Sequence, residues 1–171
     1  MADAAPPAPR TAYLLYAIPV LAALAQLTWM PRLPWAAYPN LAVVTVAAWT
    51  WSRGTRAGLW WAVAAGLVLD LGSGGALGPH ALALLAAAYV AGLVTTTIDG
   101  GLLTLPASAG LATVAYGAAL LVIGAVLRES SLHVHANAGW IFGTSIWSAV
   151  LAPLAVLVVR RLDRAVAAVR W

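Results

Sequence analysis

The sequence predicts an all-α integral membrane protein with six transmembrane helices and no separate soluble domain. Of the 171 residues, 63% are hydrophobic and only 8% are charged, whereas a soluble domain of this size is about a quarter charged. Because so few charges cannot cover a surface that faces water, most of the surface must face lipid or other helices. At about 20 apolar residues for each span, the chain has room for roughly six spans.

A proline-rich turn separates the first two spans. We expect a flexible N-terminus over residues 1–11 and a first span over about Ala12–Trp29. This stretch imitates a signal peptide, but its apolar run is long enough to span, so we expect it to be retained. The second span, about Trp35–Trp51, is interrupted by Pro39-Asn40, and its apolar part from Leu41 is too short to cross about 30 Å of hydrocarbon. Either the helix begins before Pro39 or the chain enters the membrane unwound there.

The third and fourth spans flank the most distinctive loop of the chain. A basic turn with Arg53 and Arg56 precedes a short third span, about Ala57–Leu71. A glycine-rich loop, Gly72–Pro79, follows, and its backbone needs partners within the protein if it lies at membrane depth. The fourth span is about Pro79–Ile98, with proline in the first helical turn, where its missing N–H costs nothing.

The last two spans lead into a basic tail. The fifth span is about Leu103–Leu127, the sixth is about Gly139–Val159 with a kink at Pro153, and residues 160–171 are predicted to form a cytoplasmic basic amphipathic helix at the membrane surface. Three glycines of the fifth span lie on one face at seven-residue spacing and favour helix packing within the chain over a groove for a partner. These glycines are Gly110, Gly117 and Gly124. The arginines of the tail, which we expect to face lipid headgroups rather than a cytoplasmic partner, are Arg160, Arg161, Arg164 and Arg170.

The distribution of arginine predicts that both termini lie in the cytoplasm. The sequence contains nine basic residues, all of them arginine. With six spans and a cytoplasmic N-terminus, only Arg32 and Arg128 lie outside, as the positive-inside rule requires. The arginines punctuate apolar runs and cluster only near the C-terminal end, which argues against nucleic acid, because a nucleic-acid site needs a basic face with polar or aromatic partners.

Asp70 requires an explanation because it ends the third span, and ionisable residues within spans are costly. A hydrated position at the outer interface, or hydrogen bonds from backbone N–H groups of the glycine loop, would satisfy it, and we favour this structural role. His80, one turn into the fourth span, is placed to donate to Asp70 across the loop. As a catalytic pair the two residues lack a nucleophile, so we expect no catalytic residue and no enzymatic activity.

The remaining polar residues give weaker signals. The glycine loop lacks the lysine and the spacing of a phosphate-binding loop. His133 and His135, even with Glu129, are better explained as a solvated loop than as a metal site, and Asp99 belongs to an ordinary Asp-Gly turn. The chain has no cysteine, which excludes thiolate sites. We therefore expect no metal and no cofactor.

The middle of the chain resembles the MreD family of rod shape-determining proteins. In this family an early proline is followed by Asn or Asp, as in Pro39-Asn40. A later span ends in Gly-Leu-x-x-Asp, as in Gly66–Asp70, and a glycine-rich turn leads to Leu-Gly followed closely by His, as in Leu77–His80. The resemblance implies a fold similar to the substrate-binding membrane subunits of energy-coupling-factor transporters.

The same resemblance implies a non-enzymatic scaffold of the bacterial inner membrane that helps to position wall synthases. Its implied partner is MreC and, indirectly, MreB, RodA and a penicillin-binding transpeptidase. The alternative is a transporter subunit that holds a vitamin-type ligand in an outward cavity, although few polar groups of the sequence converge there. We therefore expect the outer loops to bind a protein partner. The residues expected to take part are Asn40, Asp70, Gly74, Gly75, Gly78 and His80.

Overall fold

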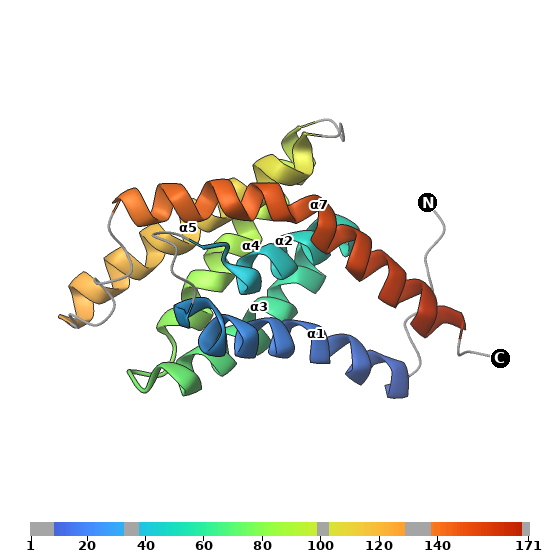
Figure 1. Ribbon diagram of the computed structural model, residues 1–171, viewed down its shortest axis with the longest axis horizontal. Coiled ribbons are helices and arrows are strands. Elements are labelled where there is room, and N and C mark those ends of the chain that lie inside the picture. Colours follow the sequence, from blue (N-terminus) through green and yellow to red (C-terminus); the bar gives the residue numbers. More distant parts are fainter. Residues whose placement is uncertain (1–8, 33–37, 99–102, 129–137, 169–171) are drawn as a thin grey trace.

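The computed structural model describes residues 9–32, 38–98, 103–128 and 138–168. Within these residues the chain forms six α-helices and one short 3-10 helix, which pack as a bundle (Figure 1). The elements are α1 (Pro9–Thr28), η1 (Met30–Arg32), α2 (Leu41–Arg53), α3 (Thr55–Ser73), α4 (Pro79–Thr97), α5 (Thr104–Leu127) and α7 (Ala138–Ala168).

Helix α2 lies at the centre of the bundle and contacts every other α-helix (Figure 1). Because it is surrounded, its apolar residues are buried on several faces rather than along one stripe. Near its C-terminal end the indole of Trp49 stacks on that of Trp61 of α3, with ring centroids 4.1 Å apart and planes 7° from parallel. The core is therefore organised around the shortest α-helix of the described chain.

The bounds of α2 answer one question that the sequence left open, and those of α3 correct one prediction. Helix α2 begins only at Leu41, so Pro39 and Asn40 are not helical, and its 13 residues span about 20 Å. The third span was predicted to be short, and this is wrong, because α3 runs for 19 residues from Thr55 to Ser73. Gly72 and Ser73 continue the helix, and the glycine-rich loop is therefore reduced to Gly74–Gly78.

The C-terminal tail was predicted to form its own amphipathic helix from residue 160. Up to Ala168 it is instead the continuation of α7. Helix α7 runs for 31 residues, with Pro153 inside it, and continues through Arg160 without a break. Figure 1 shows its C-terminal part turning away from the direction of its first part. Arg164 falls within the helix, and Arg170 lies outside the described residues. At the other terminus, α1 begins at Pro9.

Helices α3 and α4 approach so closely that their contact requires a glycine. A Cβ atom added at Gly66 would overlap the backbone of Ala81, the third residue of α4. The overlap involves main-chain atoms, so a side chain at this position would push the two helices apart. This contact fixes the start of α4 against the last two turns of α3.

The glycines of α5 turn towards α7. A Cβ at Gly117 would lie 2.7 Å from Ile141, whereas one at Gly110 would make an ordinary contact, 3.6 Å from the Cβ of Ala149. Gly124 is also buried. Gly110 and Gly117 therefore lie at a packing surface between α5 and α7.

The outward faces of the later helices are apolar. Three helical stretches of the described chain are long and apolar enough to cross a membrane, namely Pro79–Thr97, Thr104–Leu127 and Gly139–Arg161. Large side chains on their surface include Leu82, Val122 and Leu157, each more than half exposed. A soluble protein of this size seldom exposes so much apolar surface, so these faces are suited to lipid.

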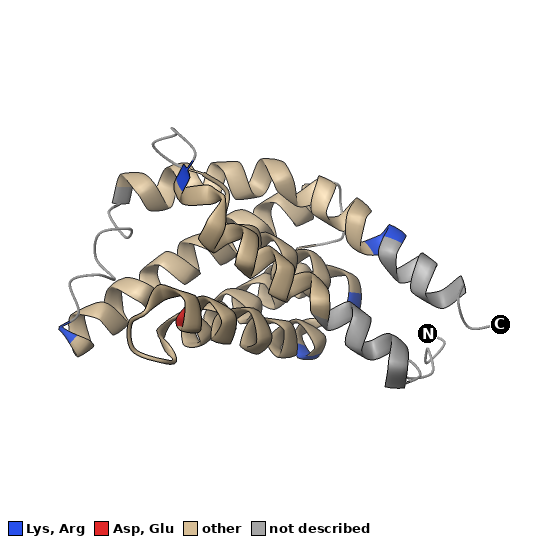
Figure 2. Ribbon diagram, turned by 60° about the horizontal axis from the view of Figure 1, so that its bottom comes forward, with Lys and Arg blue, Asp and Glu red and all other residues tan. Residues whose placement is uncertain are grey.

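Two ends of the bundle differ in charge. We call the end that holds Thr28, Asn40, the Gly74–Gly78 loop and Leu127 the loop end, and the opposite end, with Arg53, Arg56, Arg160 and Arg161, the basic end. Figure 2 shows blue arginine positions both on the side where α1 begins and α7 ends and on the opposite side, where the red acidic position lies towards the glycine loop. That acidic residue is Asp70. The loop end also holds Arg32 and Arg128, so it has charges of both signs.

Candidate functional site at the loop end

The carboxylate of Asp70, in α3, caps the N-terminus of α4 on the other side of the glycine loop. Its Oδ2 accepts hydrogen bonds from the backbone N–H groups of Gly78, at 2.9 Å, and Ala81, at 3.2 Å. Its Oδ1 accepts from the N–H of His80, at 2.8 Å. The first N–H groups of a helix have no partner within the helix and carry partial positive charge, so a carboxylate is well suited to this position.

The imidazole of His80 completes the arrangement around Asp70. Its Nδ1 lies 3.0 Å from the carboxylate Oδ1, and the Asp70 side chain is fully buried. The predicted hydrogen bonds from the loop backbone and from His80 to Asp70 are therefore confirmed. A buried carboxylate with this many donors is satisfied, so its local role is to hold the loop and the first turn of α4.

The loop itself depends on glycine at its two ends. Gly74, which ends α3, has φ of +69°, and Gly78, which precedes α4, has φ of +114°. Both conformations lie in the region that residues with a Cβ rarely adopt. Ser73, the last residue of α3, adds a third restraint, because its hydroxyl oxygen accepts from the N–H of Gly75 in the loop at 3.5 Å and the hydroxyl donates to the backbone oxygen of Asp70 at 2.9 Å. The loop is thus short and tied to α3 at several points.

The start of α2 is satisfied by the side chain of Asn40, which precedes it, and by one side chain each from α1 and α7. Asn40, 2% exposed, accepts from the N–H of Val43 at 3.1 Å in the manner of a helix N-cap. Its own N–H donates to the hydroxyl of Ser148 in α7, at 3.1 Å. The N–H of Leu41 donates to the side-chain oxygen of Gln26 in α1, at 2.7 Å. Pro39-Asn40 therefore marks a helix start buried inside the protein.

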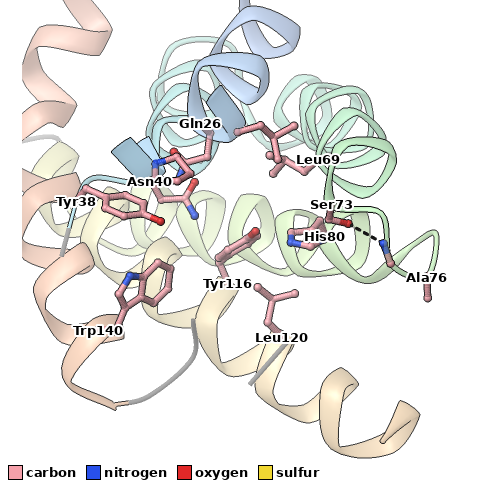
Figure 3. A pocket seen from close by; sticks show the side chains of 13 residues that line it. Gln26, Tyr38, Asn40, Leu69, Ser73, Ala76, His80, Tyr116, Leu120 and Trp140 are labelled. Atoms are coloured by element: carbon pink, nitrogen blue, oxygen red, sulfur yellow. Dashed lines mark hydrogen bonds between the residues drawn. The ribbon is translucent and has the colours of Figure 1, made fainter. Parts of the chain in front are cut away.

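A pocket of about 320 Å³ opens between these two helix starts. Figure 3 shows side chains from the surrounding helices converging on it, with the ring of Tyr116 between Asn40 and His80. The rings of His80 and Tyr116 lie 6.4 Å apart, and those of Tyr38 and Trp140 meet edge to face at 6.2 Å. The other lining residues are Gln26, Leu27, Pro31, Leu69, Ser73, Gly75, Ala76 and Leu120.

The structure brings together most of the residues that the sequence singled out. Asn40, Gly75 and His80 line the pocket, and Asp70 lies behind His80 with Gly78 and Gly74 in the adjoining loop. The basic residues Arg160 and Arg161 lie at the opposite end of the molecule. His133, His135, Glu129 and Asp99 lie outside the described residues.

Sequence reasoning missed the aromatic and amide side chains of the pocket. Tyr116 is a polar residue inside the apolar fifth span, and Gln26 and Ser148 occupy similar positions in the first and sixth spans. Isolated polar residues within spans were the available signal, since such residues usually face the bundle interior. Tyr38 and Trp140, by contrast, belong to ordinary interfacial sequence and gave no distinctive pattern.

The arrangement offers binding surfaces rather than reactive groups. Within the described residues, the hydrogen bonds of the Asp70 carboxylate come from backbone N–H groups and the ring of His80, and none comes from a serine or threonine hydroxyl. In the described part of the chain, no three His, Cys, Asp or Glu residues are grouped so as to hold a metal ion. Aromatic rings, amides and a short rigid loop are instead typical of sites that recognise a partner or a ligand.

These features define a helical membrane protein whose loop end carries a restrained glycine loop beside a pocket. The comparison with protein families identifies it further: the model of the family described as rod shape-determining protein MreD matches residues 10–166. Because the match covers nearly the whole chain, the chain belongs to the MreD family. Membership implies a role in rod shape determination as a structural, multi-pass membrane protein.

The other comparisons add no relative. No curated protein and no solved structure matches the chain. The expected similarity to the substrate-binding subunits of energy-coupling-factor transporters therefore stays a prediction, as do the six spans and the cytoplasmic location of both termini.

Proposed function

We propose that this chain is a non-enzymatic scaffold of the bacterial wall-elongation complex, located in the cytoplasmic membrane. In this proposal it binds MreC through its loop end and helps to position the wall synthases. RodA, a penicillin-binding transpeptidase and the MreB filament are then indirect partners. The observation that carries the proposal is the restrained loop Gly74–Gly78 beside an aromatic-lined pocket, in a chain of the MreD family.

The topology expected from the arginines supports the choice of the loop end. If the basic end faces the cytoplasm, as the positive-inside rule predicts, the loop end faces outward. MreC, as the family resemblance implies, carries its ectodomain outside the membrane. The membrane-proximal part of such an ectodomain would meet the glycine loop and the pocket mouth first.

The surface chemistry of the loop also suits a protein partner. Leu77 lies within the loop and Leu71 in the last turn of α3, and they are 69% and 72% exposed. Asp70 holds the loop in one conformation, so little conformational entropy remains to be lost on binding. Interfaces gain most from apolar and aromatic anchors that fill preformed pockets, and the pocket beside Leu77 provides such a place.

The proposal is tested by co-expressing the chain with MreC from the same genome and measuring co-purification through detergent and size exclusion. Leu77→Arg alters the exposed loop, and Gly75→Leu fills the pocket wall. Leu103→Arg is the matched control, because Leu103 is 80% exposed in the connection before α5 at the opposite end. We expect a stoichiometric complex with the wild type and with Leu103→Arg, and loss of the complex with both loop-end variants. Full complex formation by both loop-end variants would refute the proposed binding surface.

The pocket also favours one alternative, a substrate-binding membrane subunit of a vitamin-type transporter. Its volume of about 320 Å³ lies at the lower end of the usual range for small-molecule sites, and its lining combines apolar and polar groups. A small molecule that co-purifies in stoichiometric amount, detected by mass spectrometry, together with failure to bind MreC would favour this alternative.

A further inference from the structure

Two guanidinium groups lie over indole rings in the last turns of α2, at the basic end. The Cζ atom of Arg53 is 5.4 Å from the ring centroid of Trp49, and that of Arg160 is 4.8 Å from the ring centroid of Trp51. A cation within about 6 Å of an indole centroid is attracted by the negative face of the ring. Arg160 of α7 is therefore held in a defined place against α2.

A guanidinium that lies over an indole ring and is exposed can still present N–H donors to a ligand. Its N–H donors lie in the plane of the group and fit two oxygens of a phosphate at once. Arg56, Arg160 and Arg161 are all exposed. Among the side chains that the structure describes, the only carboxylate is that of Asp70, at the loop end. No described carboxylate therefore lies beside the guanidiniums of Arg56, Arg160 and Arg161.

The surface next to these arginines is apolar. Leu157, one helical turn before Arg161, is 58% exposed, and Val158 is 48% exposed. They continue the outward apolar face of α7, which was assigned to lipid above. A ligand that combines a phosphate with hydrocarbon chains would meet both surfaces together, whereas an acidic soluble protein would match only the arginines.

We infer that Arg160, which lies over the ring of Trp51, and the adjacent Arg161 form a binding site for the headgroup of an anionic phospholipid at the junction of α2 and α7. Arg56 adds positive charge at the same end. The acyl chains of the lipid lie along Leu157 and Val158. This site is separate from the loop end and does not depend on the binding of MreC.

The test measures which lipids stay bound to the purified full chain. The chain is incubated in detergent with an equimolar mixture of phosphatidylglycerol and phosphatidylcholine, and retained lipids are counted by native mass spectrometry. We expect preferential retention of phosphatidylglycerol, reduced about fivefold by each of Arg160→Gln and Arg161→Gln. Trp51→Leu should also reduce the preference, although it leaves every charge in place. Arg32→Gln, at the loop end, removes the same charge from an exposed position and should leave the preference unchanged.

Several outcomes would overturn the inference. Unchanged phosphatidylglycerol retention in both arginine variants would exclude the site, and an equal loss in Arg32→Gln would show that only the net charge matters. Unchanged retention in Trp51→Leu, with a melting temperature equal to that of wild type, would show that the contact of Arg160 with Trp51 does not contribute to lipid binding. Equal retention of the two lipids by the wild type, with arginine-dependent capture of an acidic protein instead, would assign the patch to a soluble partner.

Discussion

Replacing Asp70 by leucine removes the acceptor that the start of α4 depends on. Three backbone N–H groups and the ring of His80 lose their partner. Hydrogen bonds to a charged group contribute about 1.5–3 kcal/mol each, and an anion at a helix N-terminus adds about 0.3–1 kcal/mol. Gly78 and His80 are half-buried and can recruit water, whereas Ala81 is buried. We therefore expect a loss of about 3–5 kcal/mol, less than the sum of the separate terms.

Asp70→Asn separates the shape of the side chain from its acceptor capacity. Both carboxylate oxygens of Asp70 accept from backbone N–H groups. The NH₂ group of asparagine would therefore face an N–H donor in either orientation of the amide. We expect a loss of about 2 kcal/mol, intermediate between wild type and leucine. The control is Ser73→Ala, which removes one hydrogen bond to a backbone oxygen from an exposed residue and should cost less than about 1 kcal/mol.

Two measurements check this prediction on the purified chain. Thermal unfolding in detergent should show a melting temperature about 10 °C lower for Asp70→Leu, by the scaling found for domains of this size. The chain contains no cysteine, so Ala83→Cys provides a single thiol at a buried position of α4. Its maleimide labelling should accelerate in the Asp70→Leu background if the start of α4 opens. A melting temperature and a labelling rate equal to those of Ser73→Ala would refute the structural role of Asp70.

Two further predictions concern helix packing and capping, each measured as the free energy of unfolding. Gly66→Ala should cost about 1–3 kcal/mol, because the new methyl group overlaps the backbone of Ala81, whereas Gly110→Ala should be neutral or stabilising by up to about 1 kcal/mol; equal effects would contradict the packing argument. Asn40→Ala should cost about 1 kcal/mol or more through the lost cap. Combining it with Ser148→Ala should cost less than the two separate losses, because both act on the start of α2.

Much of the fold was predictable because composition and periodicity report on helices in lipid. The proline at the first turn of α4 and the boundaries of α5 agree closely with the prediction. The end of α3 was predicted two residues too early, since Gly72-Ser73 resembles loop sequence although the helix continues to Ser73. What decides this boundary is the position of Asp70, which must reach α4 from the last turn of α3. That constraint is tertiary, and local sequence cannot express it.

In the candidate site, the contact between Asp70 and His80 could be predicted from the sequence, but most of the other contacts could not. Asp70 and His80 are close in sequence and separated by glycines, so their contact followed from a short loop. The approach of Asn40 to Ser148, 108 residues apart, depends on how α2 and α7 pack. The same holds for the contact of Arg160 with Trp51. Contacts of this kind arise from the arrangement of whole helices, and no local pattern in the sequence encodes them.

The two capped helix starts determine what the pocket is suited to bind. A free helix N-terminus would attract an anion, but Asp70 already occupies the start of α4, and Asn40, Gln26 and Ser148 satisfy that of α2. No arginine is among the described residues that line the pocket. The remaining groups are aromatic rings, amides and hydroxyls, which favour an uncharged occupant with apolar surface and a few hydrogen-bonding groups. Under the two proposals made above, the loop end binds an apolar protein segment and the basic end binds anionic lipid, so one small chain would contact partners of different chemistry at its two ends.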